Sequence, residues 1–197
     1  RRVNAIQNGE AIFSCSISFQ KREKGLNHQI KMPKIQGPEK LKSDLELRKD
    51  LKSKIPKDYL PMWLREREIE TRQVEPVDLL NAVKLPPYRS TWMKPTGKLP
   101  ADERIHQALL LYVSDMGLLG AAVNPHEVNF MSKKFQSASL DHVMWFHGKV
   151  NFNNWILHHM HSPISQNARG FSRGSIYTKS GKLVASTAQE GLMRIWD

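Results

Sequence analysis

Cysteine is almost absent from this chain of 197 residues. Cys15 stands alone in the alternating run 12–19, so no intramolecular disulfide can form, and we expect a reducing compartment. Long apolar runs are missing too: none approaches the roughly 18 residues that cross a bilayer. The stretch 108–113 is at most a buried helical segment. The sequence therefore predicts no membrane span.

The first residue is Arg1, and the beginning of the chain lacks both a methionine and the pattern of a signal peptide. A strand-like pattern follows at once. We therefore expect a fragment or a processed piece of a longer protein, with further structure upstream of Arg1.

Acidic residues are too few to balance the basic ones, and the net charge is +11. Residues 21–57 hold 12 Lys or Arg against 5 Asp or Glu, a net +7 in one segment. Basic surfaces bind nucleic acids by counterion release, but this segment contains three prolines and no aromatic side chain for base stacking. The pattern favours a solvated connector and argues against nucleic acid as a partner. A polyanion such as coenzyme A would also be attracted.

Two similar hairpins are present near the ends of the chain. Residues 2–19 alternate around the turn signal Asn8-Gly9, and residues 173–190 do so around Ser180-Gly181. This weak internal repeat indicates that the first hairpin closes a unit that begins upstream. We predict three parts: residues 1–20 as the end of a truncated first unit, 21–60 as a lysine-rich linker, and 61–197 as a complete second unit.

The second unit has the pattern of one helix with several strands. Asp102 and Glu103 mark a helix start, and apolar residues then recur on nearly every side up to Met116, which predicts a helix buried all round. Gly117 and Gly120 end it. Strands are expected at 69–75, 88–94, 138–150, 155–161, 170–178 and 182–193, with a short amphipathic helix at 41–51. The fold class is α+β, an antiparallel sheet wrapped around a central helix, which is the hot-dog layout.

Three residues of this unit could act on water. Asp115 lies in the last turn of the apolar helix, where a carboxylate would be desolvated unless it has partners and could orient or deprotonate water. It could instead bond the amides of the following loop or lie at the surface of a frayed helix end. Ser139 and Asp141 should share one strand face and His142 the other, which disfavours a Ser-His-Asp triad. No Gly-x-Ser-x-Gly elbow is present. Gln189 can hold water or donate to an oxyanion.

The histidines suggest a metal site only at first sight. His159 and His161 should share one strand face, but no Cys or carboxylate completes a ligand set with them, so we predict no metal. A hot-dog dehydratase would need a histidine paired with an acid on the central helix. His106 has no suitable neighbour there.

These positions resemble a known family. The stretches 1–9, 18–20, 114–115, 138–147, 168–174 and 183–191 are similar to those of the acyl-CoA thioesterase II family, whose chains fuse two hot-dog units. The resemblance implies that Asp115, Ser139 and Gln189 bind the water that attacks the thioester. It also implies that Arg169 and Arg173 meet phosphates of coenzyme A, although both could simply be solvated charges at a strand edge.

The resemblance implies an acyl-CoA hydrolase of the double hot-dog type that uses no cofactor and forms a homo-oligomer. The alternative is a non-catalytic hot-dog module that binds acyl-CoA or assembles with partners. Family members in eukaryotes are peroxisomal, so we expect the peroxisomal matrix for a eukaryotic source and the cytoplasm otherwise. The chain ends Ile195-Trp196-Asp197 and shows no peroxisomal tripeptide.

Overall fold

A strongly curved antiparallel sheet with one central helix dominates the computed structural model, which describes residues 1–78, 80–128, 130 and 132–196. Its strands run in the order β3-β4-β7-β8-β9-β5, and β6 also pairs with β9. The strands are β1 (Arg2–Gln7), β2 (Glu10–Ser16), β3 (Ile69–Gln73), β4 (Tyr88–Pro95), β5 (Phe135–Ser139), β6 (Val143–Phe146), β7 (Ile156–Gln166), β8 (Arg169–Thr178) and β9 (Leu183–Ile195). The helices are α1 (Asp44–Asp50), α2 (Leu60–Trp63), α3 (Glu103–Ser114) and α4 (Gly120–Val123).

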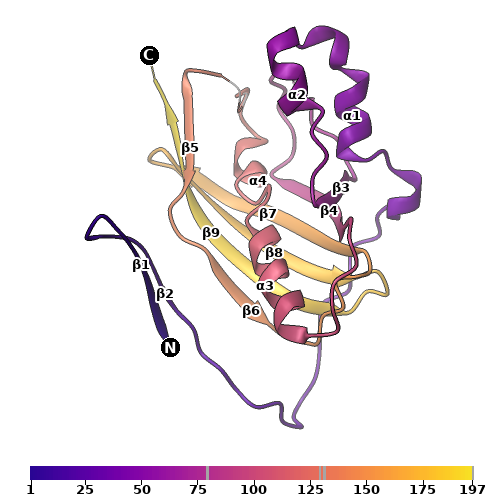
Figure 1. Cartoon of the computed structure of the whole chain (residues 1–197), viewed down its shortest axis with the longest axis vertical. Coiled ribbons are helices and arrows are strands. Elements are labelled where there is room, and N and C mark those ends of the chain that lie inside the picture. Colours follow the sequence, from indigo (N-terminus) through magenta and orange to yellow (C-terminus); the bar gives the residue numbers. More distant parts are fainter. Residues whose placement is uncertain (79, 129, 131, 197) are drawn as a thin grey trace.

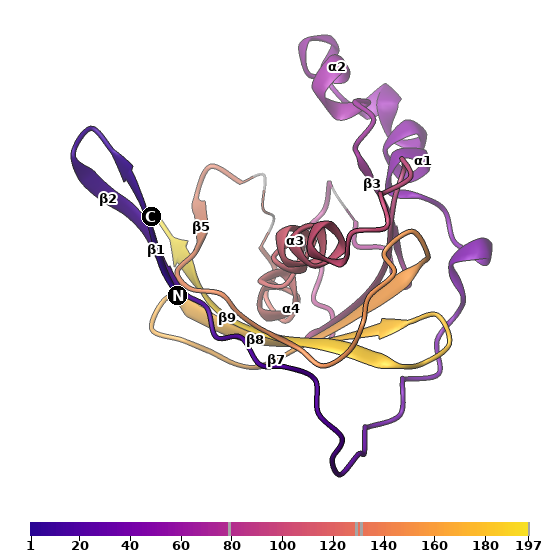
Figure 2. The ribbon, with the colours of Figure 1, turned by 60° about the horizontal axis from the view of Figure 1, so that its bottom comes forward.

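Helices α3 and α4 lie on the concave side of the sheet (Figures 1 and 2). Asp102 caps α3 by accepting a hydrogen bond from the backbone N–H of Arg104. Leu110 and Val113 are fully buried and pack with Ile156 and Ile176 of the sheet. The hot-dog arrangement predicted from the pattern is therefore confirmed.

The helix α3 is not buried on every side, and that prediction was wrong. Tyr112 is 66% exposed, and Ile105 and Leu111 are also exposed. The sheet covers only the side of the helix that carries Leu110 and Val113. A helix that is apolar all round is buried only when other elements pack against every side of it. In the described part of this chain, the sheet packs against one side of α3 alone.

The first hairpin forms as expected. Strands β1 and β2 pair around Asn8 and Gly9, whose φ angles are 51° and 85°, the left-handed conformation that a tight two-residue turn requires. The hairpin is a separate two-stranded sheet with exposed apolar side chains such as Ile6, Ile12 and Phe13. It lies away from the main sheet in Figure 2. Its assignment to a truncated first unit stays a prediction.

The segment between the hairpin and the second unit is partly packed. Met32, Ile35 and Leu41 cover Trp92 and its neighbours on the convex face of the sheet. The indole N–H of the buried Trp92 donates to the carbonyl of Gln36 at 2.9 Å. The predicted amphipathic helix is α1, which starts with a capping box between Ser43 and Glu46. The domain division at residues 20 and 60 stays a prediction.

The expected single strand over 138–150 is divided in two. Ser139 pairs with Gly191 and Val143 with Ala188, so three residues, 140–142, face the two residues 189–190 of β9. One extra residue on one strand is a β-bulge, which bends the strand and redirects its side chains. The backbone N–H of Glu190 donates to the carboxylate of Asp141 at 2.7 Å and helps to hold the bulge.

Candidate active site

Asp115 follows the last residue of α3 and is its C-cap. One carboxylate oxygen, Oδ1, accepts two hydrogen bonds: one from the hydroxyl of Ser139 at 2.9 Å and one from Nε2 of Gln189. Asp115 is exposed and has two hydrogen-bond partners, so its carboxylate is not desolvated. Among the residues that the structure describes, Oδ2 has no hydrogen-bond partner. Asp115 is thus oriented by its neighbours and open to solvent.

Three different elements bring the three side chains together. Ser139 is the last residue of β5, immediately before the bulge, and Gln189 lies in the middle of β9 with its side chain 1% exposed. Gln189 lies on the same face of β9 as Ala185, which belongs to the core cluster with Leu110 of α3, so it faces the concave side. The amide of Gln189 donates to Asp115 from β9, and the hydroxyl of Ser139 donates to it from β5. Both leave the second carboxylate oxygen free to bind water.

The bulge also overturns one prediction about strand faces. His142 was expected to point away from Ser139, but its Nε2 lies 2.7 Å from the hydroxyl of Ser114, at the same end of α3. The extra residue shifts the alternation by one, so both side chains reach the helix. Asp141, expected to share a face with Ser139, holds the backbone of β9 instead. No Ser-His-Asp triad forms from these three residues.

A buried polar layer lies beneath this site. The hydroxyl of Ser114 contacts the carbonyl of Leu111 at 2.7 Å as well as His142. A hydroxyl has one proton, which goes to the carbonyl, so Nε2 of His142 is the donor to Ser114. Deeper in the sheet, Nε2 of His158 lies 3.3 Å from the hydroxyl of Thr187. Sequence reasoning missed Ser114 and His142 as neighbours of the site, because only the bulge brings them together.

Burial keeps the histidines of this layer uncharged. Desolvation, together with smaller effects of the nearby His142 and His159, lowers the pKa of His158 from 6.5 to about 3. Desolvation also lowers the pKa of His142, although Asp115 and Asp141 oppose that shift. A neutral imidazole in the core is compatible with folding, whereas a charged one is not.

His158 should make the protein sensitive to acid. Its pKa is lower in the folded state, so between about pH 6.5 and pH 3 the unfolded chain binds a proton that the folded chain does not. Stability is fully present above pH 6.5 and falls by about 1.4 kcal/mol per pH unit below it. Urea unfolding across this window should show a smaller slope for His158→Gln than for the parent. Equal slopes, together with an imidazole NMR signal that titrates near pH 6, would contradict this assignment.

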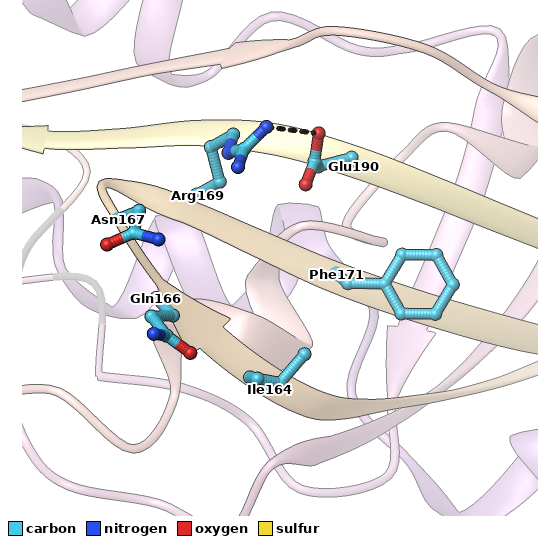
Figure 3. Close-up of a pocket in the computed structure, with 6 residues that line it drawn as sticks. All are labelled: Ile164, Gln166, Asn167, Arg169, Phe171 and Glu190. Carbon is cyan, nitrogen blue, oxygen red and sulfur yellow. Dashed lines mark hydrogen bonds and ion pairs between the residues drawn. The ribbon is translucent and has the colours of Figure 1, made fainter.

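Arg169 and Arg173 lie on the other face of the sheet. On β8 they alternate with Ser172, which faces the helices. Arg169 pairs with Glu190 at 3.3 Å, and the guanidinium of Arg173 lies 5.3 Å from the ring centre of Phe171. Arg169, Phe171 and Glu190 line a small cavity of about 200 Å³ at the β7–β8 turn (Figure 3). The structure does not bring these arginines to the Asp115 carboxylate.

Two further histidines bond to nearby hydroxyl groups. His159 lies 2.9 Å from the hydroxyl of Ser90, and His147 lies 2.8 Å from that of Ser186. Within the described ranges, no three His, Cys, Asp or Glu side chains are grouped so as to hold a metal ion. In the same part of the chain, no helix has the length and apolar character to cross a membrane.

The chain is similar to known acyl-CoA thioesterases. Residues 64–192 match the family model described as acyl-CoA thioesterase. The chain is 35% identical to acyl-CoA thioesterase 2 of Haemophilus influenzae over 192 residues, which are 98% of this chain and 67% of that protein. It is 35% identical to acyl-coenzyme A thioesterase 8 of Mus musculus over 207 residues, 99% of this chain and 63% of that protein.

A solved structure shows the same relationship. The crystal structure of an acyl-CoA thioesterase II from Mycobacterium marinum has a TM-score of 0.77 and 34% identity, and the match covers all of this chain and 68% of that one. A hot-dog protein from Alicyclobacillus acidocaldarius, at 15% identity and a TM-score of 0.66, supports the fold alone. The chain spans about two thirds of the length of the curated relatives named above. On the family model and these identities, the chain belongs to the acyl-CoA thioesterase family.

Proposed function

We propose that the protein hydrolyses fatty acyl-CoA to a free fatty acid and coenzyme A, and that Asp115, Ser139 and Gln189 bind the attacking water. The observation that carries the proposal is the convergence of Ser139 and Gln189 on one oxygen of Asp115. The names of the relatives support the substrate class. A module that only binds acyl-CoA would have no need for two donors that orient a carboxylate.

In this mechanism Ser139 and Gln189 hold Asp115, and Oδ2 accepts a hydrogen bond from the water. As the water oxygen attacks the thioester carbonyl, its proton passes to Asp115, which acts as a general base. Collapse of the tetrahedral intermediate breaks the carbon–sulfur bond. The coenzyme A thiolate leaves and takes up the proton held by Asp115, which restores the carboxylate. Gln189 has a second N–H, which can donate to the water or to the developing oxyanion.

No acyl-enzyme forms in this scheme. Asp115 already binds the hydroxyl of Ser139, but no described histidine approaches that hydroxyl to activate it as a nucleophile. The roles of Arg169 and Arg173 toward the phosphates of coenzyme A stay a prediction, and they take no part in the chemistry.

We also propose a homo-oligomer, located in the peroxisomal matrix for a eukaryotic source and in the cytoplasm otherwise. One relative, from yeast, is named a peroxisomal acyl-coenzyme A thioester hydrolase.

The direct test measures free thiol release from medium- and long-chain acyl-CoA by the full-length protein. We expect saturable release of one thiol for each fatty acid formed, without a pre-steady-state burst, because the water attacks directly. A burst equal to the enzyme concentration would indicate an acyl-enzyme and contradict the mechanism. Tight binding of acyl-CoA without any thiol release would support the non-catalytic module instead.

A further inference from the structure

Four buried polar atoms beneath the site lack partners in the described part of the chain: Nδ1 of His142, Nδ1 of His158, Oε1 of Gln189 and the hydroxyl oxygen of Ser172. The last two belong to Gln189 and Ser172, which face each other across one strand pair. Both side chains are 1% exposed, and the two residues are directly opposite each other in the β8–β9 pairing. A buried polar group without a partner is costly, and buried groups are nearly always satisfied by protein or by ordered water. Two such groups on facing residues call for a common explanation.

The orientation of the Gln189 amide matters for the chemistry. Its Nε2 donates to Asp115, which directs Oε1 into the sheet. The reversed amide would place Oε1 against the carboxylate, where two acceptors repel and the bond to Asp115 is lost. A hydrogen-bond donor inside the sheet would stabilise the productive orientation further, because it would satisfy the buried Oε1.

Ser172 is in the position to provide that donor. Residues directly opposite on antiparallel strands have Cβ atoms about 5 Å apart. The neighbouring positions on the same face of β8 are Gly170 and Gly174, which have no side chain. Thr187, two residues before Gln189 on β9, is engaged by His158. His142 uses its one proton on Ser114, so its Nδ1 accepts and cannot donate.

We propose that Ser172 is a positioning residue, whose hydroxyl donates to Oε1 of Gln189 through one buried water and so holds the amide with Nε2 toward Asp115. This inference rests on the proposed function, since the amide is held for the sake of water activation. Ser172 touches no reacting atom and acts through Gln189 alone.

A first experiment observes the amide without relying on activity. In full-length protein labelled with ¹⁵N-glutamine, the side-chain signals of Gln189 are identified by their loss in Gln189→Ala. We expect one sharp, slowly exchanging pair in the parent, broadened and fast exchanging in Ser172→Ala, and restored in Ser172→Thr, which keeps the hydroxyl. Unchanged Gln189 signals in Ser172→Ala would overturn the proposal.

A second experiment uses the kinetics of thiol release. Ser172→Ala should lower kcat about tenfold, the value of one good hydrogen bond, with KM changed less than about twofold. Ser172→Thr should recover most of kcat. In a Gln189→Ala background, Ser172→Ala should change kcat less than about twofold, because the group it positions is gone. A loss of the same factor in both backgrounds would show a purely structural role and refute the proposal.

Ser162→Ala is the matched control. Ser162 is also buried, on the neighbouring strand β7, but its hydroxyl donates to backbone carbonyls, that of Phe171 at 2.7 Å. Its removal should lower stability and leave kcat and the Gln189 signals as in the parent. If the parent protein releases no thiol, the proposed function fails, and the amide signals still decide the role of Ser172.

Discussion

Asp115→Asn should lower kcat for acyl-CoA hydrolysis about a thousandfold, within the range that a positioned general base contributes. Asparagine keeps an oxygen that can accept from Ser139 and Gln189, so the geometry of the site can persist. Its amide cannot take the proton of the attacking water. The measurement is thiol release by the full-length variant, with circular dichroism melting to show that the fold is intact.

The other end of α3 offers a matched control. Asp102 caps the helix start and pairs with Arg104, at the opposite end of α3 from Asp115. Asp102→Asn makes the same chemical change, and asparagine caps helices about as well as aspartate. We expect kcat within about twofold of the parent. If Asp115→Asn were folded and as active as Asp102→Asn, the carboxylate of Asp115 would not be the base.

Gly174→Ala should destabilise the protein by about 3 kcal/mol, the upper part of the range for overpacking a buried site. Gly174 pairs with Thr187 on β9 and with Met160 on β7, and the buried ring of His158 lies against it. An added Cβ would lie closer than 3.0 Å to the Nε2 of His158 and to the hydroxyl of Thr187. Both side chains are buried and bonded to each other, so neither can move away freely. Urea unfolding would measure the loss.

Gly97→Ala is the corresponding control for this stability experiment. A Cβ there would meet nothing within 4 Å, and its backbone is outside the left-handed region. We expect a change within about 0.5 kcal/mol. If the two glycine variants unfolded at the same urea concentration, the contact between Gly174, His158 and Thr187 would not limit the packing of the sheet.

Local pattern alone predicted much of the fold. Asn8-Gly9 and Ser180-Gly181 marked both hairpin turns, and the helix start at Asp102 and the strands of the main sheet followed from spacing. These features depend on residues near one another in sequence, such as turn glycines and capping acids. The exposure of Tyr112 and Leu111 was missed because hydrophobicity predicts which residues favour burial, and only the assembled layers decide which are covered.

The three residues of the site were named from resemblance, and each was weak when taken alone. Gln189 has no chemical signature in sequence, since an amide cannot act as a base. Its role appears when β9 brings it under Asp115, 74 positions away along the chain. Ser172 gave no signal at all. Its burial opposite Gln189 follows from strand register, which depends on pairings between distant segments.

The sequence by itself determined the fold class and the positions of the turns, and through family motifs it predicted the set Asp115, Ser139 and Gln189. Tertiary structure alone decided that both donors meet one carboxylate oxygen, that the bulge at 140–142 turns Ser139 and His142 to the same helix end, and that Arg169 and Arg173 face away. The physical reason is that one extra residue in a strand inverts which side its neighbours face. The position of the extra residue is set by the pairing of β5 and β6 with β9, and not by a local preference of residues 140–142.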